Sequence, residues 1–242
     1  MSFSAQRIFE LEVTKGNIAG HSPLDKYGVN FDIDTSAEDI WAFGGLYSGF
    51  ITSSGVAQIS SSSTADTSAG TGARTVEVFG LDASWNYQSE TVTMNGTSNV
   101  VTSGTYFRIF RMRVVTAGSG FTNAGNISAL IGGNRVAYIR NTAGSTEQAI
   151  YSIATGHTLY LDKISFQVED DKFIDAELRV NKNLDTARTT FINANYRGIS
   201  DYNYNYNYLS SIQGPADIYL RATAGANNTE VSGQITGIIV QD

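Results

Sequence analysis

Short segments that alternate apolar and polar residues, separated by turn residues, are the feature that most restricts how this chain can fold. Residues 74–80 place Val76 and Val78 on one face of an extended chain, and a later segment does the same with Val92 and Met94. Alternation with a period of two is typical of half-buried strands. Turn signals recur at roughly one per 8–12 residues, a spacing typical of sandwiches and barrels. We therefore predict an all-β fold, an antiparallel β-sandwich or jelly roll.

Two local patterns refine this prediction. Residues 95–96 are Asn-Gly, the strongest hairpin signal of the sequence, because both residues tolerate a positive φ. The three arginines within residues 106–115 do not share one face of a regular strand. We therefore expect a register shift or bulge near Phe110.

The chain divides into three predicted parts. Residues 1–34 alternate only in places, which favours an extended N-terminal arm that reaches a neighbouring subunit; the alternative is a first edge strand followed by a loop. We expect residues 35–155 to form one β part and residues 156–242 to form a second, packed on the first or nested with it. No linker rich in proline, glycine or charge separates these two parts.

Composition excludes several kinds of function. The chain has no cysteine, which removes disulfide frameworks, thiolate metal sites and cysteine nucleophiles. With 16 basic and 23 acidic residues its net charge is −7, unfavourable for binding a phosphate backbone, so we predict no nucleic-acid partner. The longest apolar run, near residues 235–240, is too short to span a bilayer, and we predict no membrane partner. Residues 1–9 carry no apolar core of a secretory signal.

Motifs for catalysis and metal binding are weak. The chain has two histidines, and His157 precedes a predicted strand with no serine in a nucleophile-elbow motif. Three adjacent acidic residues at 169–171 fit a solvated hairpin turn better than a pair of catalytic carboxylates. Asp82, Ser84 and Asn86 resemble the opening of a calcium loop, but an Asx turn explains them better. We predict a protein that is not an enzyme, with no cofactor and no metal.

A tyrosine–asparagine tract stands out in the last third of the chain. Tyr202, Tyr204, Tyr206 and Tyr208 alternate with asparagines, so all four rings would share one face of an extended chain. Tyrosine offers a large, rigid contact area at low entropic cost. Three interpretations stay open: a half-buried strand of the fold, a contact with a neighbouring subunit, or a platform on which sugars stack.

Several segments carry a resemblance to a known class of protein. They are residues 72–83 (GARTVEVFGLDA), 89–96 (SETVTMNG), 38–41 (EDIW) with 44–47 (GGLY), 61–72 (SSSTADTSAGTG) and 118–127 (GSGFTNAGNI). Together these segments resemble virion structural proteins of tailed bacteriophages, especially phages of aquatic bacteria. The resemblance covers roughly residues 34–168, implies a component of the virus particle, and leaves open whether it belongs to the capsid or the tail.

From these features we predict a capsid decoration or cement protein that stabilises the outer shell. The partners implied are the major capsid protein or neighbouring virion subunits, and a homo-oligomer such as a trimer. The predicted interface residues are Phe3, Ile8, Phe9, Leu11, Tyr202, Tyr204, Tyr206 and Tyr208.

Three alternatives stay open. One is a tail adaptor, fibre or knob that contacts the host surface. Another is a carbohydrate-binding module that uses the tyrosine tract together with Trp85. The weakest is an enzyme that depends on His157.

Overall fold

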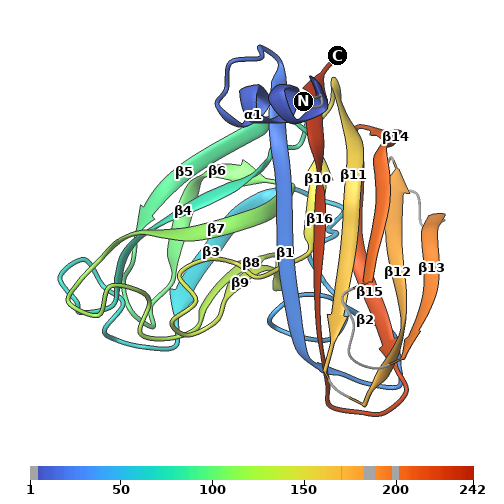
Figure 1. The fold of residues 1–242 in the computed structure, drawn as a ribbon. Helices are drawn as coiled ribbons and strands as arrows, with labels where there is room; N and C mark the ends of the chain where they lie inside the picture. Colours follow the sequence, from blue (N-terminus) through green and yellow to red (C-terminus); the bar gives the residue numbers. More distant parts are fainter. Residues whose placement is uncertain (1–4, 170, 183–188, 198–201) are drawn as a thin grey trace.

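The protein consists almost entirely of antiparallel β-sheet. A computed structural model describes residues 5–169, 171–182, 189–197 and 202–242, and Figure 1 shows its course. Every strand pairing among these residues is antiparallel, so the all-β part of the sequence prediction is confirmed. The elements are α1 (Ala5–Thr14), β1 (His21–Ile33), β2 (Glu38–Asp39), β3 (Gly55–Ser61), β4 (Ala73–Leu81), β5 (Tyr87–Thr93), β6 (Val100–Tyr106), β7 (Arg108–Ala117), β8 (Ile127–Ile131), β9 (Asn134–Ile139), β10 (Ile150–Ile153), β11 (His157–Val168), β12 (Phe173–Lys182), β13 (Thr189–Arg197), β14 (Tyr202–Gln213), β15 (Ala216–Ala224) and β16 (Thr229–Gln241).

The described strands form four sheets. Their orders are β6-β3-β8-β9, β5-β4-β7, β1-β16-β11-β14, and β10-β15-β12-β13 with β2 beside β15. We call the part built from β3 to β9 the first lobe, and the part built from β1, β2 and β10 to β16 the second lobe; they lie side by side in Figure 1. A jelly roll has two sheets, whereas the described strands form four. The jelly-roll form and the predicted division into domains therefore stay predictions.

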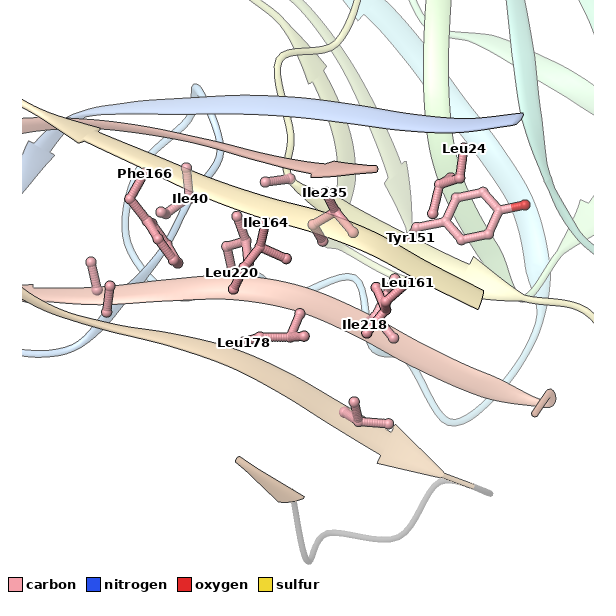
Figure 2. Close-up of a cluster of buried hydrophobic side chains, with 14 of the residues drawn as sticks. Leu24, Ile40, Tyr151, Leu161, Ile164, Phe166, Leu178, Ile218, Leu220 and Ile235 are labelled. Carbon is pink, nitrogen blue, oxygen red and sulfur yellow. The ribbon is translucent and has the colours of Figure 1, made fainter. Parts of the chain in front are cut away.

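Each lobe has its own hydrophobic core. In the second lobe, alternate residues of both sheets point inward and meet in one cluster, shown in Figure 2. Leu161, Ile164 and Phe166 of β11 face Leu178 of β12 and Leu220 of β15 across this layer. The core of the first lobe draws residues from both of its sheets in the same way. Period-two burial therefore explains why these segments form strands.

The N-terminal segment is part of the fold, and the predicted extended arm is wrong for the residues that the structure describes. α1 is a helix, and β1 pairs with β16 from His21↔Val240 to Ile33↔Thr229. The strand buries Leu24 and Ile33 in the core of the second lobe. Its pattern is hard to recognise because a lysine and a glycine also occupy buried positions between them.

Two local predictions have opposite outcomes. The bulge is confirmed, because Arg111 pairs with Phe79 while Ile109 pairs with Gly80, which leaves Phe110 without an opposite residue on β4. The hairpin at residues 95–96 is wrong, because β5 pairs with β4 whereas β6 pairs with β3. The chain crosses between the two sheets of the first lobe at this point.

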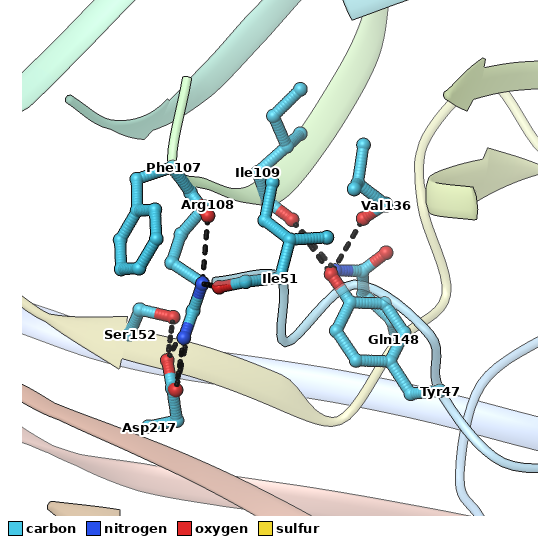
Figure 3. A network of polar contacts seen from close by, with 9 residues as sticks. All are labelled: Tyr47, Ile51, Phe107, Arg108, Ile109, Val136, Gln148, Ser152 and Asp217. Atoms are coloured by element: carbon cyan, nitrogen blue, oxygen red, sulfur yellow. Dashed lines mark hydrogen bonds and ion pairs between the residues drawn. The ribbon is translucent and has the colours of Figure 1, made fainter. Parts of the chain in front are cut away.

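A buried ion pair joins the two lobes (Figure 3). Arg108 at the start of β7 donates from Nε to Asp217 of β15 at 2.9 Å, and both side chains are about 1% exposed. The Ser152 hydroxyl also donates to Asp217, at 2.6 Å. The second guanidinium nitrogen, Nη1, donates to the carbonyl oxygens of Ile51 and Phe107, both at 2.8 Å. The buried charges are thus fully partnered, which a low-dielectric site requires.

Candidate interaction surface

Helix α1 exposes its apolar side chains. Ile8, Phe9 and Leu11 are 56%, 41% and 51% exposed, whereas Val13 is buried. Single exposed apolar residues are common on protein surfaces, but three within one helical turn are unusual. Phe9 and Leu11 are two positions apart and therefore lie on opposite sides of the helix. All three were predicted interface residues; the fourth from this segment, Phe3, lies outside the described residues.

The tyrosine tract does not present one face, because a bulge interrupts β14. Lys163 of β11 pairs with Asn205 and Leu161 pairs with Ser210, so the four residues 206–209 lie opposite Asp162 alone. Asn207 and Tyr208 adopt positive φ values of 50° and 62° within this bulge. A bulge re-aims the side chains that it contains.

The first three tyrosines belong to the edge of the second-lobe core. Tyr202 and Tyr204 lie opposite Phe166 and Ile164, two buried core residues, and Tyr206 is buried in the same cluster. The Tyr204 and Tyr206 rings are in edge contact, with centroids 4.8 Å apart. Of the three interpretations, the half-buried strand describes this part of the tract.

The bulge directs Tyr208 to the opposite face of the sheet, where it meets α1. Its hydroxyl donates a hydrogen bond of 3.0 Å to the Glu10 carboxylate. A groove of about 330 Å³ lies between the helix and the sheet, and its lining is mainly apolar. The groove is lined by Phe9, His21, Tyr160, Tyr208, Ile238 and Val240.

Two carboxylates give this groove an acidic rim. Burial raises the pKa of the Asp162 carboxyl, and the nearby Glu10 carboxylate raises it further. Burial also raises the pKa of the Tyr208 phenol, and the hydrogen bond to Glu10 adds to that effect. The two acids therefore repel one another. The charge of Lys163 acts on Asp162 in the opposite direction, but no described residue forms an ion pair with either acid.

Leu209 follows Tyr208 in the bulge and is 90% exposed. We call Ile8, Phe9, Leu11, Tyr160, Tyr208 and Leu209 the α1 surface. The structure thus brings Phe9 and Tyr208 together at one groove, and Ile8 and Leu11 lie on the same helix as Phe9. It separates Tyr202, Tyr204 and Tyr206 from them. Sequence reasoning missed Tyr160, which alternates with the buried Leu159 and Leu161, and Leu209, which lies in the bulge; neither carries a signal of its own.

Two residues of the alternative hypotheses, Trp85 and His157, lie outside the α1 surface. Trp85 is buried against the Phe107 ring, with the Arg108 guanidinium carbon 5.1 Å from its centroid, so the proposed sugar-stacking role of Trp85 is wrong. His157 contacts the Thr155 carbonyl at 3.0 Å and packs edge-on against Tyr87.

The calcium candidate forms the expected Asx turn. One Asp82 oxygen accepts the backbone N–H groups of Ser84 and Asn86 at 2.8 and 2.9 Å. Among the described residues, no group of three or more histidine or acidic side chains is placed to hold a metal ion. Within the same residues, no helix has the length and apolar character needed to cross a bilayer.

Comparison with known proteins gives only weak likenesses. No family model matches the chain, and no curated protein matches it. Among solved structures, the naturally occurring empty particles of cowpea mosaic virus align at a TM-score of 0.23 and 8% identity, over 77% of this chain and 82% of that chain. Infectious bursal disease virus of the Gx strain aligns at 0.22 and 8%, over 91% and 70%.

The subviral particle of infectious bursal disease virus VP2 aligns at a TM-score of 0.23 and 9% identity, over 91% of this chain and 72% of that chain. All three solved structures are described as a virus or as virus particles. Likenesses of this strength carry no argument about what the present chain does.

Proposed function

We propose that this protein is a non-enzymatic structural component of a virion, and that it attaches to neighbouring virion subunits through the α1 surface. The virion context rests on the sequence resemblance over residues 34–168. The mode of action rests on one observation: two segments at opposite ends of the chain converge on one apolar, solvent-exposed groove.

The physical basis is burial of apolar surface. Ile8, Leu11 and Leu209 are each at least half exposed, and covering such side chains stabilises a complex by roughly 25 cal/mol per Å² of apolar area removed from water. The acidic rim adds a preference for a partner surface that brings a cation. One contact of this size is weak, but repetition over a symmetric shell multiplies its effect.

The finer proposal is a decoration or cement protein on the outer capsid, whose partners are the major capsid protein and further copies of this chain. In that arrangement each lobe is a β-sandwich, with two sheets around one core. The bonded Tyr208–Glu10 pair holds the groove in shape before assembly, which lowers the entropic cost of binding.

Quantitative mass spectrometry of purified particles tests this proposal. A copy number close to that of the major shell protein is the expected result for a decoration protein. A few copies per particle would instead assign the protein to the tail or a vertex, with host contact as its role. Absence from the particle would contradict the virion proposal altogether.

A further inference from the structure

The loop between β7 and β8 carries Phe121, which is more exposed than any other large apolar residue that the structure describes. Phe121 is 91% exposed and has a φ of 63°. A positive φ is an outlier for a bulky residue and costs backbone energy. A large apolar ring is therefore held in water by a backbone conformation that the residue itself disfavours.

Hydrogen bonds brace this loop. The Gly118 N–H donates to the Gly72 carbonyl and the Gly120 N–H to the Thr71 carbonyl, both at 2.8 Å. The two loops approach so closely that a Cβ on Gly118 would lie 2.2 Å from the carbonyl oxygen of Gly70. Phe121 is consequently presented by a fixed support, and little conformational entropy is lost when the ring binds.

The ring cannot reach the groove of its own chain. β7 starts at Arg108, in the junction between the lobes, and runs through Ala117 away from it. At about 3.3 Å per residue, the strand carries the loop roughly 30 Å from that junction. Three strands that line the groove, β1, β11 and β16, belong to the second lobe, on the other side of the junction (Figure 1).

Charge matches the loop to the groove. Arg74 donates from Nε to the Gly70 carbonyl at 3.1 Å, beside the turn that supports the Phe121 loop. Arg74 forms no ion pair within the described part of the chain. The groove offers the complement: an apolar lining and the two mutually repelling carboxylates of Glu10 and Asp162.

We propose that Phe121 of one copy inserts into the α1 groove of a second copy, with Arg74 approaching the Glu10 and Asp162 carboxylates. Such a contact joins two different patches, so it is head-to-tail and propagates into a ring or a lattice. This inference rests on the proposed function, since it names a further copy of the chain as one occupant of the α1 surface.

Sedimentation velocity of the purified chain over a concentration series tests the contact. We expect the mean mass to rise above the 26.1 kDa of one chain. Phe121→Ser and Phe9→Glu should each weaken association by about tenfold or more, the size of a hot-spot loss. Val101→Ser, which changes a 59% exposed apolar residue on β6, serves as the matched control and should leave association unchanged.

Mixing two variants gives the sharpest test. The Phe121→Ser chain keeps its groove and the Phe9→Glu chain keeps its loop. An equimolar mixture should therefore form a dimer at a concentration at which each weakened variant alone is monomeric. Thermal melting shows that each variant folds, and Tyr160→Glu replaces Phe9→Glu if that variant does not.

Three results would overturn the contact: a wild-type chain that stays monomeric, a Phe121→Ser chain that associates normally, or a mixture without dimers. A monomeric chain that is nevertheless abundant in particles would refute this contact and leave the proposed function intact. Loss from particles would refute the function itself.

Discussion

The Tyr208 hydroxyl lies 3.0 Å from the Glu10 carboxylate, and this hydrogen bond joins residues that are 198 positions apart in the sequence. It fixes helix α1 over the outer face of the sheet that contains β11 and β16, with Phe9 and Tyr160 on either side of the groove. The shape of the α1 surface therefore depends on a contact between two segments that the sequence presents separately.

The first prediction concerns this pair. Tyr208→Phe should lower the free energy of unfolding by about 1 kcal/mol, less than is usual for a charged acceptor because the pair is partly open to water. Glu10→Gln should cost less, because its amide oxygen still accepts from Tyr208 and the repulsion from Asp162 is removed. The double variant should cost less than the sum of the two. Urea denaturation measures the cycle, and amide exchange over residues 5–14 should quicken in each single variant. If the effects of the two single substitutions simply add in the double variant, the Tyr208–Glu10 hydrogen bond does not hold α1 against the sheet.

The second prediction concerns the junction between the lobes. Asp217→Asn leaves the buried Arg108 guanidinium without its counter-charge and should destabilise the fold by about 3–5 kcal/mol. The matched control is Glu77→Gln, which removes the partner of Arg113, a side chain that is 56% exposed. The control should cost less than about 1 kcal/mol. Equal effects in urea titrations would contradict the role given to the buried pair.

The third prediction uses the buried Lys26, which donates from Nζ to the Phe110 carbonyl at 2.6 Å. Burial, reinforced by the charge of Arg111, lowers the pKa of Lys26 from 10.5 to about 7. Between these values the unfolded chain binds more protons than the folded chain. The free energy of unfolding should therefore rise from pH 7 to pH 9, by at most about 1.4 kcal/mol per pH unit.

Substitution separates this lysine from other titrating groups. Lys26→Met should be more stable than the wild type at pH 7 and should lose most of the rise with pH. Lys15→Met, which changes a 51% exposed lysine just after the end of α1, should keep the wild-type slope. If Lys26→Met shows an unchanged slope in urea titrations at several pH values, the buried amine is not its source.

The fourth prediction concerns Asp66, a buried carboxylate that accepts the backbone N–H groups of Ala73, Ala124 and Gly125 at 2.6, 2.8 and 2.9 Å. Asp66→Asn replaces one acceptor oxygen by an amide donor that faces these N–H groups. The free energy of unfolding, followed by thermal melting, should therefore fall by about 3 kcal/mol or more. Asp82→Asn alters an exposed Asx turn and should cost much less. If Asp66→Asn and Asp82→Asn lower the stability by similar amounts, the buried Asp66 carboxylate does not have the structural role given to it.

The strands could be predicted where alternation is regular. β4 and β5 match the pattern carried by Val76, Val78 and Val92, and the arginines of β7 correctly indicated the bulge at Phe110. β1 was missed because Lys26 and Gly28 occupy inward positions that the alternation rule expects to be apolar.

The candidate site could be predicted only in part. The apolar residues of α1 and the tyrosine tract are visible in the sequence, but their meeting depends on how β14 pairs with β11. The four-residue bulge at 206–209 sends Tyr206 into the core and Tyr208 to the opposite face. Pairing between distant strands carries no local sequence signal, and neither does the sheet crossing after β5.

The central claim is that the α1 surface attaches this protein to the virion, and the copy number of a surface variant in purified particles tests it most directly. A chain with Ile8→Ser and Leu11→Ser is compared with one carrying Val101→Ser and Val115→Ser, whose original side chains are 59% and 49% exposed on β6 and β7. We predict that the first variant folds normally but is lost from particles, whereas the control is incorporated like the wild type. Full incorporation of the first variant would contradict the account.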